Sequence, residues 1–240
     1  MINKRNFYIN GSWVAPINGA DFPVLNPATE ETYAVISLGG KEDAEAAIKA
    51  ARAAFSSWSM TTPQERAEYL KALLASYEAR SDEMATSIST EMGAPIDMSM
   101  TDQTGAGKSH LKAFLRALDN FEWSKPIRPG MEGQELVHEA AGVAALITPW
   151  NWPMNQVVLK VGAALAAGCT MVLKPSEIAP MSSVLFAEMV HEAGLPAGVF
   201  NMVNGDGAGV GTILSSHPDI DVVSFTGSTR AGILISKAAA

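Results

Sequence analysis

Charged side chains directly after an apolar run are the first candidates for chemistry in this sequence. The run 169–173 is followed by Lys174-Pro175-Ser176-Glu177. In open parallel sheets ligands bind at the carboxyl ends of strands, where an acidic residue can accept hydrogen bonds from both hydroxyls of an adenosine ribose. Lys174 adds a donor for the same sugar or for a phosphate on it. The alternative is a surface lysine beside a glutamate that begins a helix, but the position after a strand favours binding.

A second candidate is the junction Phe225-Thr226-Gly227-Ser228, which follows an apolar run and opens a helix pattern. Backbone N–H groups and the helix dipole favour a phosphate at such a junction. Gly227 allows close approach, and Ser228 can donate its hydroxyl. Many ordinary turns share this pattern. The glycine-rich stretch 205–211 fits no G-x-G-x-x-G register, so the usual dinucleotide fingerprint is absent.

Asn151 lies between two tryptophans, Trp150 and Trp152, just before an apolar helix pattern. It could be the N-cap of that helix. Pro153, however, prefers the first helical position, which would make Trp152 the cap. The functional interpretation is an amide donor directed at a developing oxyanion. The sequence leaves both interpretations open.

Two stretches resemble reactive groups but are predicted to be structural. Cys169 begins an apolar strand, and no histidine lies near it in the sequence, so we interpret it as a buried thiol. Gly107-Lys108-Ser109 resembles the end of a phosphate-binding P-loop, but that motif needs a glycine where Asp102 stands and a strand before it. We predict no metal site.

A parallel sheet is needed to bring the candidates together, and the pattern from residue 142 onward predicts one. The stretch 142–177 has strand–loop–helix–strand character, and alternating strands and helices continue to the last residue. Repeated βα units with short loops imply an open α/β fold with helices on both faces of a parallel sheet.

The part of the chain before residue 122 is predicted to support this sheet. Apolar residues around Asn10-Gly11 predict a hairpin, and the runs 22–25 and 32–36 would complete an N-terminal β-meander. Amphipathic helices are then expected from Lys41, from the capping box of residues 62–65, from Ser81, and over about 102–120. None carries a constellation of reactive groups.

The segment 122–139 is polar, contains two prolines and two glycines, and lacks a helical period. It is either an arm that pairs with a partner chain or a solvent loop, and the residues alone do not separate these interpretations.

Composition narrows the class of protein. The chain has 240 residues, 48% of them hydrophobic and 18% charged, which is ordinary for a globular α/β protein. Its net charge is −8 with no basic stripe, so nucleic acid is not an expected partner. No apolar run is long enough to suggest a membrane span. A single cysteine fits a reducing compartment, and we expect a cytoplasmic protein.

Taken together, the motifs resemble the NAD(P)-dependent aldehyde dehydrogenase superfamily. They are Thr148-Pro149-Trp150-Asn151-Trp152-Pro153, Ala163-Ala164-Leu165-Ala166-Ala167-Gly168, Leu173-Lys174-Pro175-Ser176-Glu177 and Phe225-Thr226-Gly227-Ser228-Thr229, with Ile9-Asn10-Gly11, Trp13 and Asn26-Pro27-Ala28 before them. Their order and spacing match as a set, over the whole length of the chain.

The resemblance implies a Rossmann-like sheet that binds NAD, with NADP possible, without the usual glycine fingerprint. Asn151 would donate to the oxyanion of a thiohemiacetal. Glu177 would favour NAD because its charge repels a 2′-phosphate, whereas Lys174 would favour NADP. The residues expected to contact the cofactor are Ile147, Pro149, Trp150, Lys174, Ser176, Glu177, Gly207, Phe225, Gly227 and Ser228.

The resemblance also implies a domain organisation. Residues 1–121 and 140–240 would form a discontinuous dinucleotide-binding domain, and 122–139 would be the oligomerisation arm of a homodimer or homotetramer. The family's cysteine nucleophile and glutamate base match no motif here, so the catalytic domain is expected beyond residue 240. The main hypothesis is the cofactor-binding part of an enzyme that oxidises an aldehyde to an acid. The alternative is a non-catalytic dinucleotide-binding or oligomerising fragment.

Overall fold

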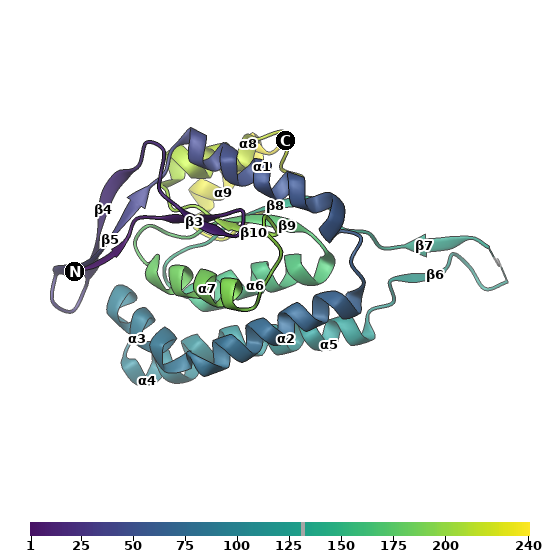
Figure 1. The fold of residues 1–240 in the computed structure, drawn as a ribbon, viewed down its shortest axis with the longest axis horizontal. Coiled ribbons are helices and arrows are strands. Elements are labelled where there is room, and N and C mark those ends of the chain that lie inside the picture. The colour runs from purple at the N-terminus through teal and green to yellow at the C-terminus, as the bar shows by residue number, and fades with distance from the viewer. Residues whose placement is uncertain (131–132) are drawn as a thin grey trace.

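The computed structural model describes residues 1–130 and 133–240, and a six-stranded sheet forms its centre (Figure 1). The four strands predicted from residue 142 onward are parallel neighbours. β8 and β9 are buried along their whole length, as expected of parallel strands covered on both faces. In sheet order the strands are β11 (Val222–Phe225), β8 (Val143–Ile147), β9 (Thr170–Lys174), β10 (Phe200–Met202), β2 (Phe7–Ile9) and β3 (Ser12–Val14).

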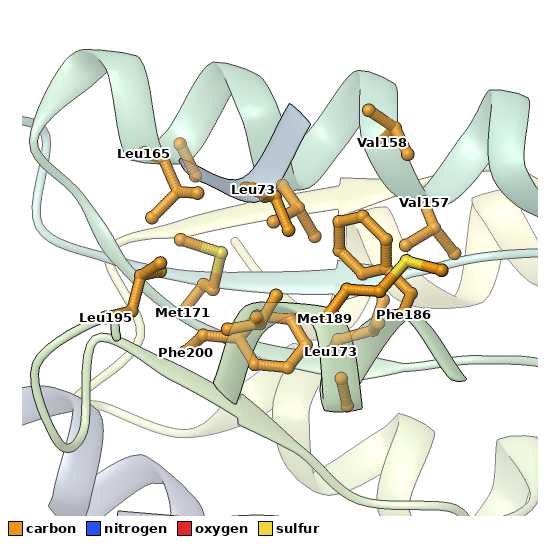
Figure 2. Close-up of a cluster of buried hydrophobic side chains, with 14 of the residues drawn as sticks. Leu73, Val157, Val158, Leu165, Met171, Leu173, Phe186, Met189, Leu195 and Phe200 are labelled. Atoms are coloured by element: carbon orange, nitrogen blue, oxygen red, sulfur yellow. The ribbon is translucent and has the colours of Figure 1, made fainter. Parts of the chain in front are cut away.

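Helices cover both faces of this sheet, which confirms the predicted α/β class (Figure 1). One face packs against α6 (Pro153–Ala167) and α7 (Met181–Glu192), and the other packs against α1 (Lys41–Trp58). Alternate side chains of each strand point to opposite faces. Met171 and Leu173 therefore join the cluster of buried side chains shown in Figure 2, whereas Val172 joins the cluster beneath α1.

An outer layer of helices lies beyond α6 and α7. It consists of α2 (Pro63–Ala79), α3 (Ser81–Met92), α4 (Ile96–Met98), a π-helical turn η1 (Ser99–Gln103) and α5 (Thr104–Asn120). The predicted capping box opens α2, because Thr62 Oγ1 accepts from the Glu65 N–H at 3.2 Å and the Thr62 N–H donates to Glu65 Oε2 at 2.7 Å.

The N-terminal strands are divided between two sheets and do not form one meander. The hairpin β2–β3 turns at Asn10 and Gly11, both with positive φ, and extends the central sheet by antiparallel pairing with β10. The other three strands form a separate sheet in the order β1 (Ile2–Lys4), β5 (Glu31–Leu38), β4 (Ala20–Asn26). β2 is buried on both faces, so it requires the coverage that only the central sheet provides.

The P-loop-like residues lie inside α5 and not after a strand. A Cβ placed on Gly107 would lie 2.4 Å from Tyr77 Oη, so this glycine allows α5 to pack against α2. The nucleotide-loop interpretation is therefore excluded, as the sequence predicted.

The segment 122–139 contains β6 (Ser124–Pro126) and β7 (Glu135–Val137), an antiparallel pair that projects from the body of the protein (Figure 1). All residues of both strands are exposed. At its base the ring of Phe121 packs against Trp123, with centroids 4.7 Å apart, and against His138 at 5.0 Å. Residues 131–132 of the predicted arm lie outside the described residues.

Candidate functional site

The parallel strands end side by side and bring the predicted residues to one edge of the sheet. Phe225 pairs in register with Ile147, and Ile147 pairs with Lys174. Neighbouring strands are about 4.8 Å apart, so the last residues of β11 and β9 lie about 10 Å from each other. The loops that follow also stay together, because the Thr148 N–H donates to the Lys174 carbonyl at 3.2 Å and the Thr226 N–H donates to the Ile147 carbonyl at 3.1 Å.

Lys174 is buried, with 3% of its surface exposed, and is not a surface lysine. Its Nζ donates to the carbonyls of Pro175 at 2.8 Å and Gly205 at 2.6 Å, and it lies 3.5 Å from Glu177 Oε2. Burial lowers the pKa of Lys174, and the charges of Glu177 and Asp206 oppose that shift. The ammonium therefore ties the end of β9 to the loop after β10 and helps to orient Glu177.

Glu177 is partly exposed beyond this buried lysine, so its carboxylate is open to a ligand. Ser176 is buried, and its Oγ accepts a hydrogen bond from the Ile178 N–H at 3.3 Å. Ser176 thus shapes the loop, whereas Glu177 carries the group that can contact a sugar hydroxyl.

The glycine-rich stretch forms a π-helical turn, η2 (Gly207–Gly211), followed by α8 (Thr212–Ser216). Asp206 is its N-cap and accepts from the Gly209 N–H. Gly207 is exposed, and no described atom lies within 4 Å of the position that its Cβ would take. The turn therefore leaves open space at Gly207 without any G-x-G-x-x-G register.

Ser228 is the N-cap of α9 (Thr229–Ala238), where its Oγ accepts from the Ala231 N–H at 3.2 Å. Its hydroxyl hydrogen can still donate to an anion, and the exposed helix N-terminus favours negative charge. Packing also requires a glycine at position 227, because a Cβ there would lie 2.5 Å from the ring of Phe225.

The capping interpretation of Asn151 is wrong, because Trp152 occupies the N-cap position of α6 and Pro153 is its first residue. Asn151 is exposed, and its side-chain amide makes no hydrogen bond with the described residues. Its backbone carbonyl accepts from Gln103 Nε2 at 3.4 Å. Trp150 is 47% exposed beside it. The amide group is thus available for an oxyanion.

Cys169 lies at the opposite edge of the sheet from these groups. It is 6% exposed and directly precedes β9, whereas Lys174 is the last residue of that strand. At about 3.3 Å per residue, the two are roughly 17 Å apart. This location agrees with a structural thiol.

Two buried polar residues near the site were not predicted. Lys160 on α6 is buried, donates to Ser224 Oγ at 2.9 Å, and has its pKa lowered by burial. Asn204 has neither side-chain amide atom paired within the described residues, although both are buried. A lysine in a largely apolar helix was a visible signal for Lys160, whereas nothing in the sequence marked Asn204.

The described residues contain neither a cluster of metal-ligating side chains nor a membrane-spanning helix. In residues 1–130 and 133–240, no group of three or more His, Cys, Asp or Glu side chains could hold a metal ion. None of the helices in that part of the chain combines the length and the apolar character needed to cross a membrane.

The open, mostly parallel sheet and its covering helices define an α/β protein of the Rossmann-like class. Residues 13–240 match the model of the aldehyde dehydrogenase family. The chain belongs to that family.

Similar proteins extend well beyond the length of this chain. A 3-succinoylsemialdehyde-pyridine dehydrogenase of a Pseudomonas species is 49% identical over 100% of this chain and 50% of its own length. A crystal structure of an aldehyde dehydrogenase from Bartonella henselae is 57% identical, with a TM-score of 0.98 over 100% of this chain and 50% of that one. A mutant of aldehyde dehydrogenase C from Pseudomonas syringae, solved with NAD+ and octanal, is 46% identical. Its TM-score is 0.95, and the match covers 98% of this chain and 48% of that one. The chain therefore spans about half the length of these relatives.

Proposed function

We propose that this chain is the cofactor-binding portion of an NAD-dependent aldehyde dehydrogenase that oxidises an aldehyde to a carboxylic acid. The observation that carries the proposal is the alignment of Phe225, Ile147 and Lys174 at one sheet edge, with Glu177, Ser228 and the exposed Asn151 beside them. Family membership and the NAD+-bound relative support the choice of cofactor.

The exposed groups at this edge fit a dinucleotide. Glu177 accepts hydrogen bonds from the adenosine ribose, and Ser228 with the N-terminus of α9 binds the pyrophosphate. Gly207 leaves room for the backbone to approach. NAD supplies the hydride acceptor when bound. The apolar walls of the site are formed by Ile147, Pro149, Trp150 and Phe225, while Lys174, Ser176 and Gly227 shape its loops.

Asn151 donates its amide N–H to the oxyanion that forms when a thiolate adds to the aldehyde carbon. Its position outside α6 leaves both amide hydrogens free of the helix. A donor of this kind contributes about 10²–10³ in rate. The nucleophile is a cysteine outside these 240 residues, because Cys169 is buried at the far edge of the sheet.

The domain organisation is part of the same proposal. Residues 1–121 and 140–240 form the dinucleotide-binding domain, and 122–139 is an arm through which copies assemble into a homodimer or homotetramer. The projection of β6 and β7 from the body supports the arm (Figure 1). The lone free cysteine supports a cytoplasmic location.

Titration of the purified chain with NAD and NADP tests cofactor binding. NAD is expected to bind more tightly than NADP, because the Glu177 carboxylate repels a 2′-phosphate. Glu177→Gln should weaken NAD about 10-fold and narrow the difference from NADP. Glu45→Gln, which removes an exposed carboxylate on α1, is the matched control and should change neither affinity. Equal affinities of the unaltered chain for both cofactors would refute the assigned role of Glu177.

An activity assay separates the enzyme from the non-catalytic alternative. Suitable first substrates are octanal, which was solved bound to one relative, and a pyridine-bearing semialdehyde of the kind after which another relative is named. The 240-residue chain should not reduce NAD with either. A longer chain that includes the downstream coding sequence should reduce NAD with an aldehyde. In that longer chain, Asn151→Ala should lower the rate of NAD reduction about 10²–10³-fold. Turnover by the short chain would contradict the location of the nucleophile.

A further inference from the structure

We propose that Glu91, on α3, is a positioning residue for the loop 175–180 that carries Glu177. Its buried carboxylate accepts hydrogen bonds from the backbone N–H groups of Met181 and Ser182, the latter at 3.0 Å. These are the first two residues of α7, which directly follows the loop. The inference rests on the proposed function, because the role of the loop is to present Glu177 to the cofactor.

The loop is held at both ends by buried ionisable side chains. At its start, Lys174 donates to the carbonyl of Pro175 and to that of Gly205. At its end, Glu91 fixes the N-terminus of α7 from a helix 90 residues earlier in the chain. Between these anchors Glu177 is partly exposed, so its direction depends on where the two ends are placed.

α7 requires an acceptor from elsewhere because it cannot cap itself. Its N-cap residue is Pro180, which has no side-chain acceptor, and the first N–H groups of any helix lack intrahelical partners. The two carboxyl oxygens of Glu91 satisfy two of them. When the carboxyl group is ionised, its negative charge lies at the positive end of the helix dipole. Because those N–H groups face the protein interior, water cannot replace Glu91.

Glu91 makes this contact in a buried position between α3, α7 and β4. Glu91 is 2% exposed and lies where α3 packs against α7 and against β4. Met181 packs there with Val24 and Ile36 of the three-stranded sheet. Tyr33 on β5 is a titratable neighbour of Glu91. Burial is the main cause of the raised pKa of Tyr33, and the Glu91 charge adds to it.

Hydrogen exchange of the 240-residue chain without cofactor tests the contact directly. Glu91→Gln keeps the shape of the side chain but turns an NH₂ group toward one backbone N–H. Exchange at the Met181 and Ser182 amides should rise about 10-fold or more, while amides in the centre of α6 stay protected. Glu83→Gln removes a carboxylate of the same helix that pairs with Arg80 at the surface, and it should change neither region. Unchanged exchange at Met181 and Ser182 in Glu91→Gln would overturn the proposal.

NAD titration then tests whether the contact acts through Glu177. Glu91→Gln should raise the Kd for NAD about 5- to 30-fold, and the double variant Glu91→Gln/Glu177→Gln should bind no more weakly than Glu177→Gln alone. Additive losses would show that Glu91 acts elsewhere and would overturn its positioning role. If Glu91→Gln does not fold, Glu91→Asp, which keeps the charge but shortens the reach, replaces it with the same expectations. If the unaltered chain does not bind NAD, the proposed function fails, and the exchange experiment still decides whether Glu91 fixes the loop.

Discussion

At the scale of single residues, the two ends of β9 show how position decides the chemistry available to a side chain. Cys169 carries the more reactive group but is buried before the strand begins. Lys174 ends the strand at the open edge, where its ammonium is fixed by two carbonyls. The neighbouring Glu177 is the one of the three that is partly exposed, so it is the one available for direct contact with a ligand.

We expect Cys169→Ser to leave NAD binding unchanged. Cys169 lies at the sheet edge opposite the site, so its replacement alters no group near the cofactor. The serine hydroxyl would be buried in an apolar cluster, which should cost about 1–3 kcal/mol of unfolding free energy. NAD titration and urea denaturation measure the two effects. Loss of NAD binding by a variant that remains folded would assign Cys169 a function.

The protonation of Glu91 should make stability depend on pH. Burial raises the pKa of Glu91 to about 7, whereas glutamate in an unfolded chain titrates near 4.3. Between these values the folded state keeps a proton that the unfolded state has lost. The stabilisation from this group is therefore complete below about pH 4 and lost as the pH rises through about 7.

Urea denaturation of the unaltered chain and of Glu91→Gln at several pH values checks this expectation. The unfolding free energy of the unaltered chain, relative to that of the variant, should fall by about 3 kcal/mol between pH 5 and pH 8. Taking the difference cancels the other titrating groups. A difference that is constant across this range would show that Glu91 titrates normally.

The sequence predicted the strand-end residues but not what holds them. Glu177 follows from a general rule about parallel sheets, so one sequence was enough to select it. The burial of Lys174 depends on the Gly205 carbonyl, which comes from a loop 31 residues later. Glu91 has no local signal at all, because a glutamate in an amphipathic helix normally faces solvent. Such contacts depend on tertiary packing and cannot be derived from local pattern.

At the scale of elements, local signals predicted structure where the determining interactions are local. The capping box at Thr62 and Glu65 opens α2 as expected. The hairpin at Asn10-Gly11 also forms, but its turn residues do not indicate which sheet the hairpin joins. Pairing of β2 with β10 joins residues almost 200 positions apart, and only burial on both faces of β2 selects that partner.

Two glycines of α5 provide a test of the contact between Gly107 and Tyr77, which explains the glycine of the P-loop-like stretch. Gly107→Ala would place a Cβ 2.4 Å from the buried Tyr77 Oη, which donates to the Thr104 carbonyl at 3.0 Å. The resulting displacement should destabilise the protein by about 1–3 kcal/mol.

Gly105→Ala is the matched control in the same helix. No described atom lies within 4 Å of its Cβ position, so alanine should stabilise α5 by about 0.5–1 kcal/mol. Urea denaturation midpoints of both variants give the comparison. Equal shifts for the two substitutions would contradict the contact between Gly107 and Tyr77.

At the scale of the whole molecule, most of the described chain forms one layered body, and the two-stranded sheet β6–β7 projects from it (Figure 1). A two-stranded sheet on its own is only marginally stable in water, and its free edges can pair with other strands. Ile127, Leu136 and Val137 on and beside these strands are exposed apolar side chains. These features support the proposal that the arm pairs with a second copy of the chain.

Leu136→Lys should therefore weaken self-association. Burying a lysine of the arm at an interface would cost the hydration free energy of its ammonium group, whereas an exposed lysine in a monomer stays hydrated. Sedimentation velocity should show a smaller assembly for the variant at the same concentration, with unchanged circular dichroism. Ile17→Lys replaces another exposed apolar side chain, one outside the arm, and should keep the mass of the unaltered protein. If both variants sediment like the unaltered chain, residues 122–139 are a solvent loop and the assembly forms through another surface.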